Sequence, residues 1–130
     1  VGKLFQPAGL HAPGHRLEIH HQPDGPRGRN GLGTVHHVAM AIATAEEQLA
    51  LREALLGAGV GVTEVRDRQY FQSIYFREPG GVLYEVATMQ PGFAVDEPLA
   101  SLGRDLKLPP WEEPHRRSIE AGLAQVTYRA

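Results

Sequence analysis

Two stretches decide the fold of this chain: GTVHHVAMAI at residues 33–42 and GVLYEVAT at residues 81–88. Both are short, largely apolar runs bounded by glycine, which predicts strands. Each carries a side chain able to bind a metal, namely the pair His36 and His37 in the first run and Glu85 in the second. A carboxylate on an apolar strand face is unfavourable unless a positive or hydrogen-bonding group meets it. We therefore expect Glu85 to have a partner.

Strand alternation narrows the choice of that partner. Successive side chains of a strand point to opposite faces, so Glu85 shares a face with Leu83 and Ala87. His36 and His37 point to opposite faces, and alternation alone does not choose which of them joins Glu85. A metal ion held jointly by Glu85 and a histidine would satisfy the carboxylate. The alternatives are a strand acid turned to water and a histidine bonded to a neighbouring carbonyl.

The composition of the 130 residues indicates one globular domain. Interspersed charges summing to −2 give no basic surface for nucleic acid. No apolar run approaches the roughly 20 residues needed to span a bilayer, so no membrane partner is expected. The chain has no cysteine, which excludes disulfides and thiolate ligands. We expect a cytoplasmic protein whose metal site would be built from His, Asp and Glu.

Between the two stretches the predicted elements follow the order βαβββ. Thr44 is a helix N-cap with Glu47 at the third helical position, which is the spacing of a capping box. The helix is predicted to run to about Leu56. The predicted strands are residues 33–42, 60–66, 70–77 and 81–88.

The N-terminal flank is rich in glycine and proline, so little regular structure is expected there apart from a short strand at residues 15–21. Residues 13–19 resemble residues 79–86 with one insertion, because both are a Pro-Gly turn that enters a strand with an acid between apolar neighbours. We therefore interpret residues 1–32 as the remnant of a preceding βαβββ unit plus a linker.

The rest of the chain divides into two parts. Residues 33–90 are the predicted βαβββ metal-binding module, and residues 91–130 a C-terminal extension with a helix over residues 111–124. The fold class is α+β.

Longer motifs make the chain recognisable. The stretches GTVHHVAM, DRQYFQSIYFREPGG and VLYEVAT, at residues 33–40, 67–81 and 82–88, resemble the final βαβββ module of a ring-cleaving dioxygenase. The family is the glyoxalase/bleomycin-resistance/extradiol-dioxygenase superfamily, also called the vicinal oxygen chelate fold. The likeness is to its hydroquinone-type branch, where PGF, DEPL, LG and LPPW also follow the last strand. Here these motifs lie at residues 91–93, 96–99, 102–103 and 108–111.

The resemblance implies that paired βαβββ modules enclose one divalent metal ion. The family's strand histidine falls on His37 and its strand glutamate on Glu85, which are the expected metal ligands. His36 is expected to be structural or to pack against the helix. Tyr75 is the expected hydrogen-bond donor to a phenolate oxygen of the substrate. A third ligand, usually a histidine of the partner module, is expected from a missing N-terminal portion or from a homo-oligomer.

The activity implied by the resemblance is ring cleavage of a hydroquinone or catechol with O2, as in extradiol-type dioxygenases. A site of two histidines and one carboxylate is typical of Fe(II), and Mn, Ni or Zn also accept these ligands. Two alternatives stay open. A glyoxalase-like isomerase using Ni or Zn would need a second carboxylate from the partner module, and a metal-free member of the fold would bind aromatic drugs without catalysis.

Overall fold

A computed structural model describes residues 2–5, 17–26 and 30–124 of the chain. Its helices and strands follow the order β1 (Gly2–Phe5), β2 (Leu17–His20), β3 (Val38–Ile42), α1 (Ala45–Gly57), β4 (Arg66–Asp67), β5 (Gln72–Arg77) and β6 (Leu83–Thr88). Three short 3-10 helices and a second α-helix complete the described chain: η1 (Phe93–Val95), η2 (Leu99–Ser101), η3 (Glu113–His115) and α2 (Arg116–Gly122).

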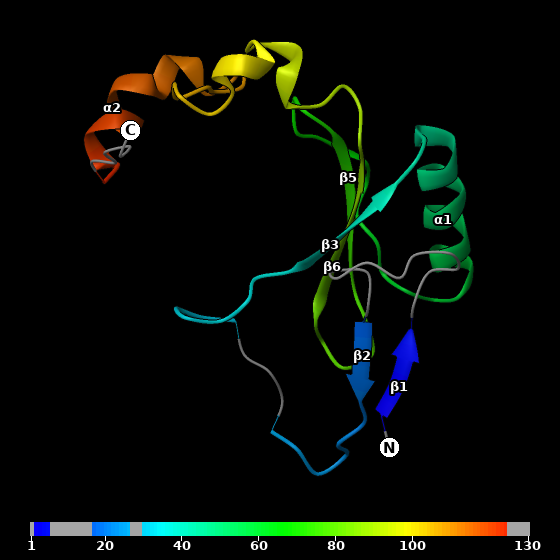
Figure 1. The fold of residues 1–130 in the computed structure, drawn as a ribbon. Coiled ribbons are helices and arrows are strands. Elements are labelled where there is room, and N and C mark those ends of the chain that lie inside the picture. Colours follow the sequence, from blue (N-terminus) through cyan, green and yellow to red (C-terminus); the bar gives the residue numbers. More distant parts are fainter. Residues whose placement is uncertain (1, 6–16, 27–29, 125–130) are drawn as a thin grey trace.

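The main sheet has four strands in the order β3-β6-β5-β4 (Figure 1). β3 and β6 pair in parallel, and the other two pairs are antiparallel. A parallel pair needs a crossover connection, which here contains α1, β4 and β5. β5 and β6 lie within the strands predicted at residues 70–77 and 81–88. The predicted βαβββ order and the α+β class are confirmed.

Helix α1 packs against the sheet and closes the core. Thr44 is its N-cap, and the Thr44 side chain accepts a hydrogen bond from the backbone N–H three residues on, at 3.1 Å, as the capping spacing predicts. Gln48, in the first turns of α1, is fully buried, and its Nε2 atom donates to the carbonyls of Gln72 and Val86 at 2.9 and 2.8 Å. Ile74 and Val86 are the buried apolar residues of the sheet. An amide thus ties the helix to the backbone of β5 and β6.

The first predicted strand is shorter than expected. The sequence predicts a strand over residues 33–42, but β3 begins at Val38. Val38 pairs with Tyr84, the second residue of β6, and the paired register of the two strands begins there. His36 and His37 therefore stand just ahead of β3, where the backbone no longer follows the sheet ladder.

The extent of the strand predicted at residues 60–66 is wrong. Within residues 60–66, Val62 makes an isolated bridge to Phe76 of β5, and Arg66 begins the two-residue strand β4. The Tyr75 N–H donates to the Thr63 hydroxyl at 3.1 Å, while the Thr63 carbonyl accepts from Arg52 Nε at 2.9 Å. The Thr63 N–H still donates to the Tyr75 carbonyl at 2.9 Å, so side chains replace one of the two backbone bonds of this pair and the ladder is interrupted.

A separate antiparallel pair, β1 with β2, precedes the main sheet (Figure 1). β2 lies within the strand predicted at residues 15–21, of which residues 15–16 lie outside the described part of the chain. β1 was not expected, because turn-forming residues dominate the composition around so short a strand. The division of the chain at residues 32 and 90 stays a prediction.

The C-terminal extension leads away from the sheet through short helices (Figure 1). The helix predicted over residues 111–124 is shorter: α2 begins at Arg116, after η3. Pro114 has no backbone N–H to continue an α-helix from the preceding turn, so the regular helix starts beyond it. Arg116 bonds the carboxylates of Glu113 and Glu120 and so stabilises this start. Among the residues described, no helix is long and apolar enough to cross a membrane.

Candidate metal centre

The register of three strands places the candidate ligands on one face of the sheet. Glu85 lies in β6, with Ala39 of β3 as its partner on one side and Tyr75 of β5 on the other. His37 precedes Ala39 by two positions, and Ser73 precedes Tyr75 by two positions. Because side chains alternate within β5 and β6, Ser73, Tyr75 and Glu85 share a face, and the core residues under α1 occupy the opposite one. His37 lies just ahead of β3 and joins this face through its contact with Glu85.

Every oxygen of the Glu85 carboxylate has a partner. The Oε2 atom lies 2.8 Å from His37 Nε2. The Oε1 atom accepts hydrogen bonds from Ser73 Oγ at 2.5 Å and from Tyr75 OH at 2.7 Å. The Glu85 side chain is only 6% exposed, whereas that of His37 is 33% exposed. Both oxygens of this buried carboxylate therefore have hydrogen-bonding partners, and Oε2 is the oxygen that faces the more exposed His37.

Two further residues surround this group. Arg68 donates from Nε to Tyr75 OH at 3.2 Å, and its guanidinium lies 5.3 Å from the centre of the Tyr75 ring. The His36 and His37 rings meet through their Nδ1 atoms at 2.7 Å, so that one ring donates and the other accepts. Of the two roles expected for His36, packing against the helix is wrong, because His36 is exposed and its ring contacts His37. His36 and His37 lie ahead of β3, so strand alternation does not separate their rings.

The three residues singled out in the sequence come together in the structure. His37 and Tyr75 both contact Glu85, from opposite sides of its carboxylate. The contacts of Ser73 and Arg68 were missed. Alternation in β5 places Ser73 on the same face as Tyr75, and this pattern could have predicted that Ser73 lies near Glu85. No pattern in the sequence points to Arg68, because its contact with Tyr75 depends on the path of the turn before β5.

The geometry of His37 and Glu85 fits two ligands of one divalent ion. Neighbouring ligands at metal–ligand distances near 2.1 Å lie about 3 Å apart, which is close to the 2.8 Å between Nε2 and Oε2. Imidazole nitrogen and carboxylate oxygen suit Fe, Mn, Ni or Zn. Within the part of the chain that the structure describes, no group of three His, Cys, Asp or Glu side chains converges. His37 and Glu85 are therefore two candidate ligands, and the described residues do not form a complete metal site.

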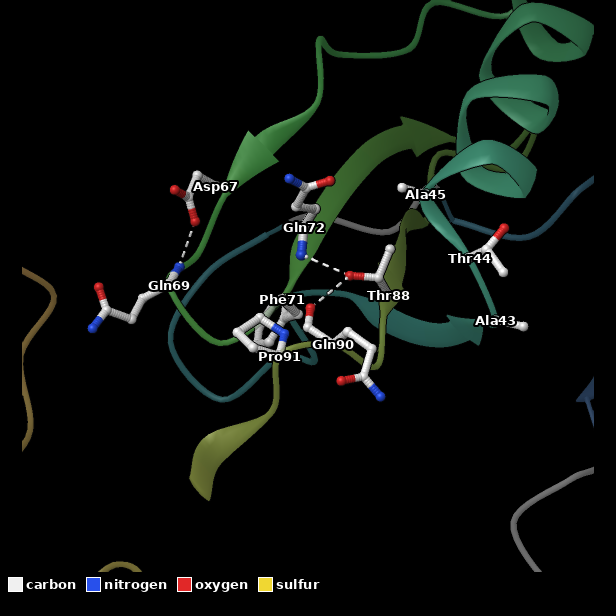
Figure 2. A pocket seen from close by; sticks show the side chains of 10 residues that line it. All are labelled: Ala43, Thr44, Ala45, Asp67, Gln69, Phe71, Gln72, Thr88, Gln90 and Pro91. Carbon is white, nitrogen blue, oxygen red and sulfur yellow. Dashed lines mark hydrogen bonds between the residues drawn. The ribbon is translucent and has the colours of Figure 1, made fainter. Parts of the chain in front are cut away.

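A hollow of about 650 Å³ lies elsewhere on the module, where β3 ends and α1 begins (Figure 2). Thr88 in its wall accepts a hydrogen bond from the Gln72 N–H at 3.0 Å and donates to the Gln90 carbonyl at 3.1 Å. Asp67 accepts from the Gln69 N–H at 2.7 Å. These bonds hold the chain around the hollow, and the residues lining it do not include His37 or Glu85.

Comparison with known proteins identifies the family. The family model of the Glyoxalase/Bleomycin resistance protein/Dioxygenase superfamily matches residues 6–86. The protein named "Putative ring-cleaving dioxygenase MhqO" of Bacillus subtilis (strain 168) is 48% identical over 116 residues, which are 89% of this chain and 37% of that protein. The "Chlorohydroquinone/hydroquinone 1,2-dioxygenase" of Sphingobium indicum is 43% identical over 83 residues, which are 62% of this chain and 25% of that protein.

A solved structure agrees in fold. A crystal structure of a "putative dioxygenase" from Bacillus subtilis strain 168 superposes with a TM-score of 0.82 at 46% identity, over 89% of this chain and 37% of that one. The present chain thus spans 37% of the length of MhqO. On the family match over residues 6–86, the chain belongs to the Glyoxalase/Bleomycin resistance protein/Dioxygenase superfamily.

Proposed function

We propose that this chain is a metal-binding module of a ring-cleaving dioxygenase that acts on a hydroquinone or catechol. His37 and Glu85 are two ligands of its divalent metal, which we propose to be Fe(II). The relative named "Putative ring-cleaving dioxygenase MhqO" supports the reaction class, and the one named "Chlorohydroquinone/hydroquinone 1,2-dioxygenase" supports the kind of substrate.

The observation that carries this proposal is the contact between His37 Nε2 and Glu85 Oε2 at 2.8 Å. The two atoms meet on an open sheet face, and Glu85 is also held there by two hydroxyl groups, those of Ser73 and Tyr75. A surface ion pair would need neither this burial nor these hydroxyl groups. Ligands of metal ions are typically oriented by such outer hydrogen bonds.

The third ligand comes from a second βαβββ module in this proposal. That module belongs to a longer polypeptide or to a second copy of the chain. Ala39 and Ala41 lie on the same sheet face as Glu85 and are exposed, so this face has room for a facing sheet. A homo-oligomer or a two-module chain would thereby complete the site.

The residues of this chain have distinct parts in the reaction. His37 and Glu85 would hold the metal, which when bound supplies a template for an aromatic diol and O2 and a Lewis acid for the diol oxygens. The Tyr75 hydroxyl donates to Glu85 Oε1 in this structure and would turn from it to donate to a phenolate oxygen of the substrate, leaving Ser73 as the donor to Oε1. Arg68 donates to the same hydroxyl oxygen and adds positive charge beside it. Both atoms of O2 enter the ring-opened acid, so no external reductant is required.

Oxygen consumption tests the proposal. The assembly that contains this module would be loaded with Fe(II) and given methylhydroquinone or catechol, and O2 uptake and bound iron would be measured. We expect Glu85→Gln to lose more than about 100-fold in activity, beyond the loss usual for an outer hydrogen-bond partner. The matched control is Glu64→Gln, because the Glu64 side chain is 87% exposed and pairs with Arg52 away from the site.

Three results would contradict the proposal. The first is stoichiometric iron with turnover that survives Glu85→Gln. The second is selective loading with Ni or Zn together with isomerase activity, which would indicate a glyoxalase-like enzyme. The third is tight binding of aromatic compounds that a chelator leaves unchanged, which would indicate a binding protein.

A further inference from the structure

We propose that Ser73 is a positioning residue that makes Glu85 a metal ligand through one oxygen only. This inference rests on the proposed metal site and adds to it a residue that touches neither metal nor substrate.

The two oxygens of Glu85 have different surroundings. Oε1 accepts two hydroxyl hydrogen bonds, from Ser73 at 2.5 Å and from Tyr75 at 2.7 Å. Oε2 has His37 Nε2 at 2.8 Å. Both acceptor sites of Oε1 are occupied by these hydroxyl bonds, so a carboxylate that bound a metal through both oxygens would have to give up at least one of them. The arrangement therefore reserves Oε1 for the protein and leaves Oε2 for the ion.

The Ser73 hydroxyl has fewer possible partners than the Tyr75 hydroxyl. Ser73 is 0% exposed, and its hydroxyl is directed at Glu85. Tyr75 is half-buried and also contacts Arg68, so its hydroxyl has other possible tasks at the rim of the site. Any effect of Ser73 on metal binding must therefore pass through Glu85.

The sheet register explains why a short hydroxyl residue serves here. Ser73 pairs with Ala87 and is the diagonal neighbour of Glu85 across the β5–β6 pair. At this distance a serine hydroxyl reaches the carboxylate without extending past it. Removing the Ser73 hydroxyl leaves the buried Oε1 atom with one donor. The Glu85 carboxylate is then free to rotate and to bind the metal through both oxygens. Metal affinity and coordination mode should both change.

The first experiment is a Mn²⁺ titration of the assembly that contains this module, with the module isotopically labelled, followed by NMR line broadening of the His37 ring and the Glu85 side chain. The broadening measures binding at the completed site and locates the ion. We expect Ser73→Ala and the nearly isosteric Ser73→Cys to weaken Mn²⁺ binding about 10–100-fold, the usual effect of losing an outer partner. Ser73→Thr keeps the hydroxyl and should stay close to wild type. Ser101→Ala is the matched control, because the Ser101 hydroxyl donates to the Pro98 carbonyl in the C-terminal extension.

The second experiment reads the coordination mode. Infrared difference spectra of Zn²⁺-loaded minus metal-free protein, with ¹³C-labelled glutamate, report the separation of the two carboxylate stretches of the bound group. A one-oxygen ligand gives a wide separation and a two-oxygen ligand a narrow one. We expect a wide separation in the wild type and in Ser73→Thr, a narrower one in Ser73→Ala and Ser73→Cys, and no signal in Glu85→Gln.

The outcomes separate the two proposals. Wild-type protein without Mn²⁺ broadening at His37, or Glu85→Gln binding as tightly as wild type, would overturn the metal site and this inference with it. Wild-type binding at His37 and Glu85, with folded Ser73→Ala and Ser73→Cys matching its affinity and stretch separation, would leave the metal site intact and overturn the role of Ser73. The cysteine variant keeps the volume of the buried side chain if the alanine variant does not fold.

Discussion

The Nε2 atom of His37 lies 2.8 Å from the Oε2 atom of Glu85, so a residue ahead of an edge strand meets a residue in the interior of the sheet. The parallel pairing of β3 with β6 brings them together, since Ala39 is the register partner of Glu85. The contact joins the first and last strands of the βαβββ unit.

His37→Gln should remove one ligand while keeping a polar side chain of similar size. We expect Mn²⁺ or Zn²⁺ affinity to fall by more than about tenfold, because the imidazole nitrogen is lost. Calorimetric titration measures this change. His20→Gln, at an exposed position where His20 pairs with Glu18 at 3.0 Å, should leave the affinity unchanged. Equal losses in both variants would show that the histidines bind metal without a defined site.

Gln48→Met should destabilise the fold without touching the candidate site. Methionine has a similar length but cannot donate to the carbonyls of Gln72 and Val86, which would be left with one partner fewer beneath the helix. We expect the free energy of unfolding to fall by about 1–3 kcal/mol. Urea denaturation measures it, with the exposed Gln22→Met as control. An unchanged midpoint would mean that the amide bonds contribute nothing net.

Thr44→Ala should weaken the start of α1. The Thr44 hydroxyl satisfies the Glu47 N–H, which is otherwise an unpaired donor of the first helical turn. We expect a loss of about 1 kcal/mol in the free energy of unfolding. Thr44→Ser keeps the acceptor and should remain near wild type. Denaturation curves that rank serine with alanine would argue against capping as the cause.

Tyr70→Phe should change the response of stability to alkaline pH. Burial raises the pKa of Tyr70, and the hydrogen bond to Asp96 at 3.0 Å raises it further. The pKa of Tyr70 in the folded protein thus lies above its value of about 10 in the unfolded chain. The stability that the Tyr70 hydroxyl contributes is therefore fully present below about pH 10 and is lost as the pH rises through the folded pKa.

Denaturation of wild type and Tyr70→Phe between neutral and strongly alkaline pH tests this expectation. The difference in the free energy of unfolding should be constant up to about pH 9 and should shrink above about pH 10. Absorbance of ionised tyrosine, followed in parallel, locates the titration. A difference that stays constant across the alkaline range would contradict a raised pKa.

Much of the fold could be predicted from local patterns. The capping spacing at Thr44 marks the start of α1, and the alternation in residues 70–77 and 81–88 marks β5 and β6. These features depend on neighbours in the sequence. The extents of β3 and β4 could not be predicted in the same way, because a strand continues only as far as its partner offers backbone groups.

The same distinction between local sequence and packing applies to the candidate site. The residue types of His37, Tyr75 and Glu85, together with the motifs around them, are properties of the sequence, and they sufficed to name the family and the expected ligands. The hydroxyl bond from Ser73 and the charge of Arg68 beside Tyr75 depend on how separate segments lie against each other. Their contacts span different strands or a turn whose path no local pattern specifies, so the packed fold alone determines them.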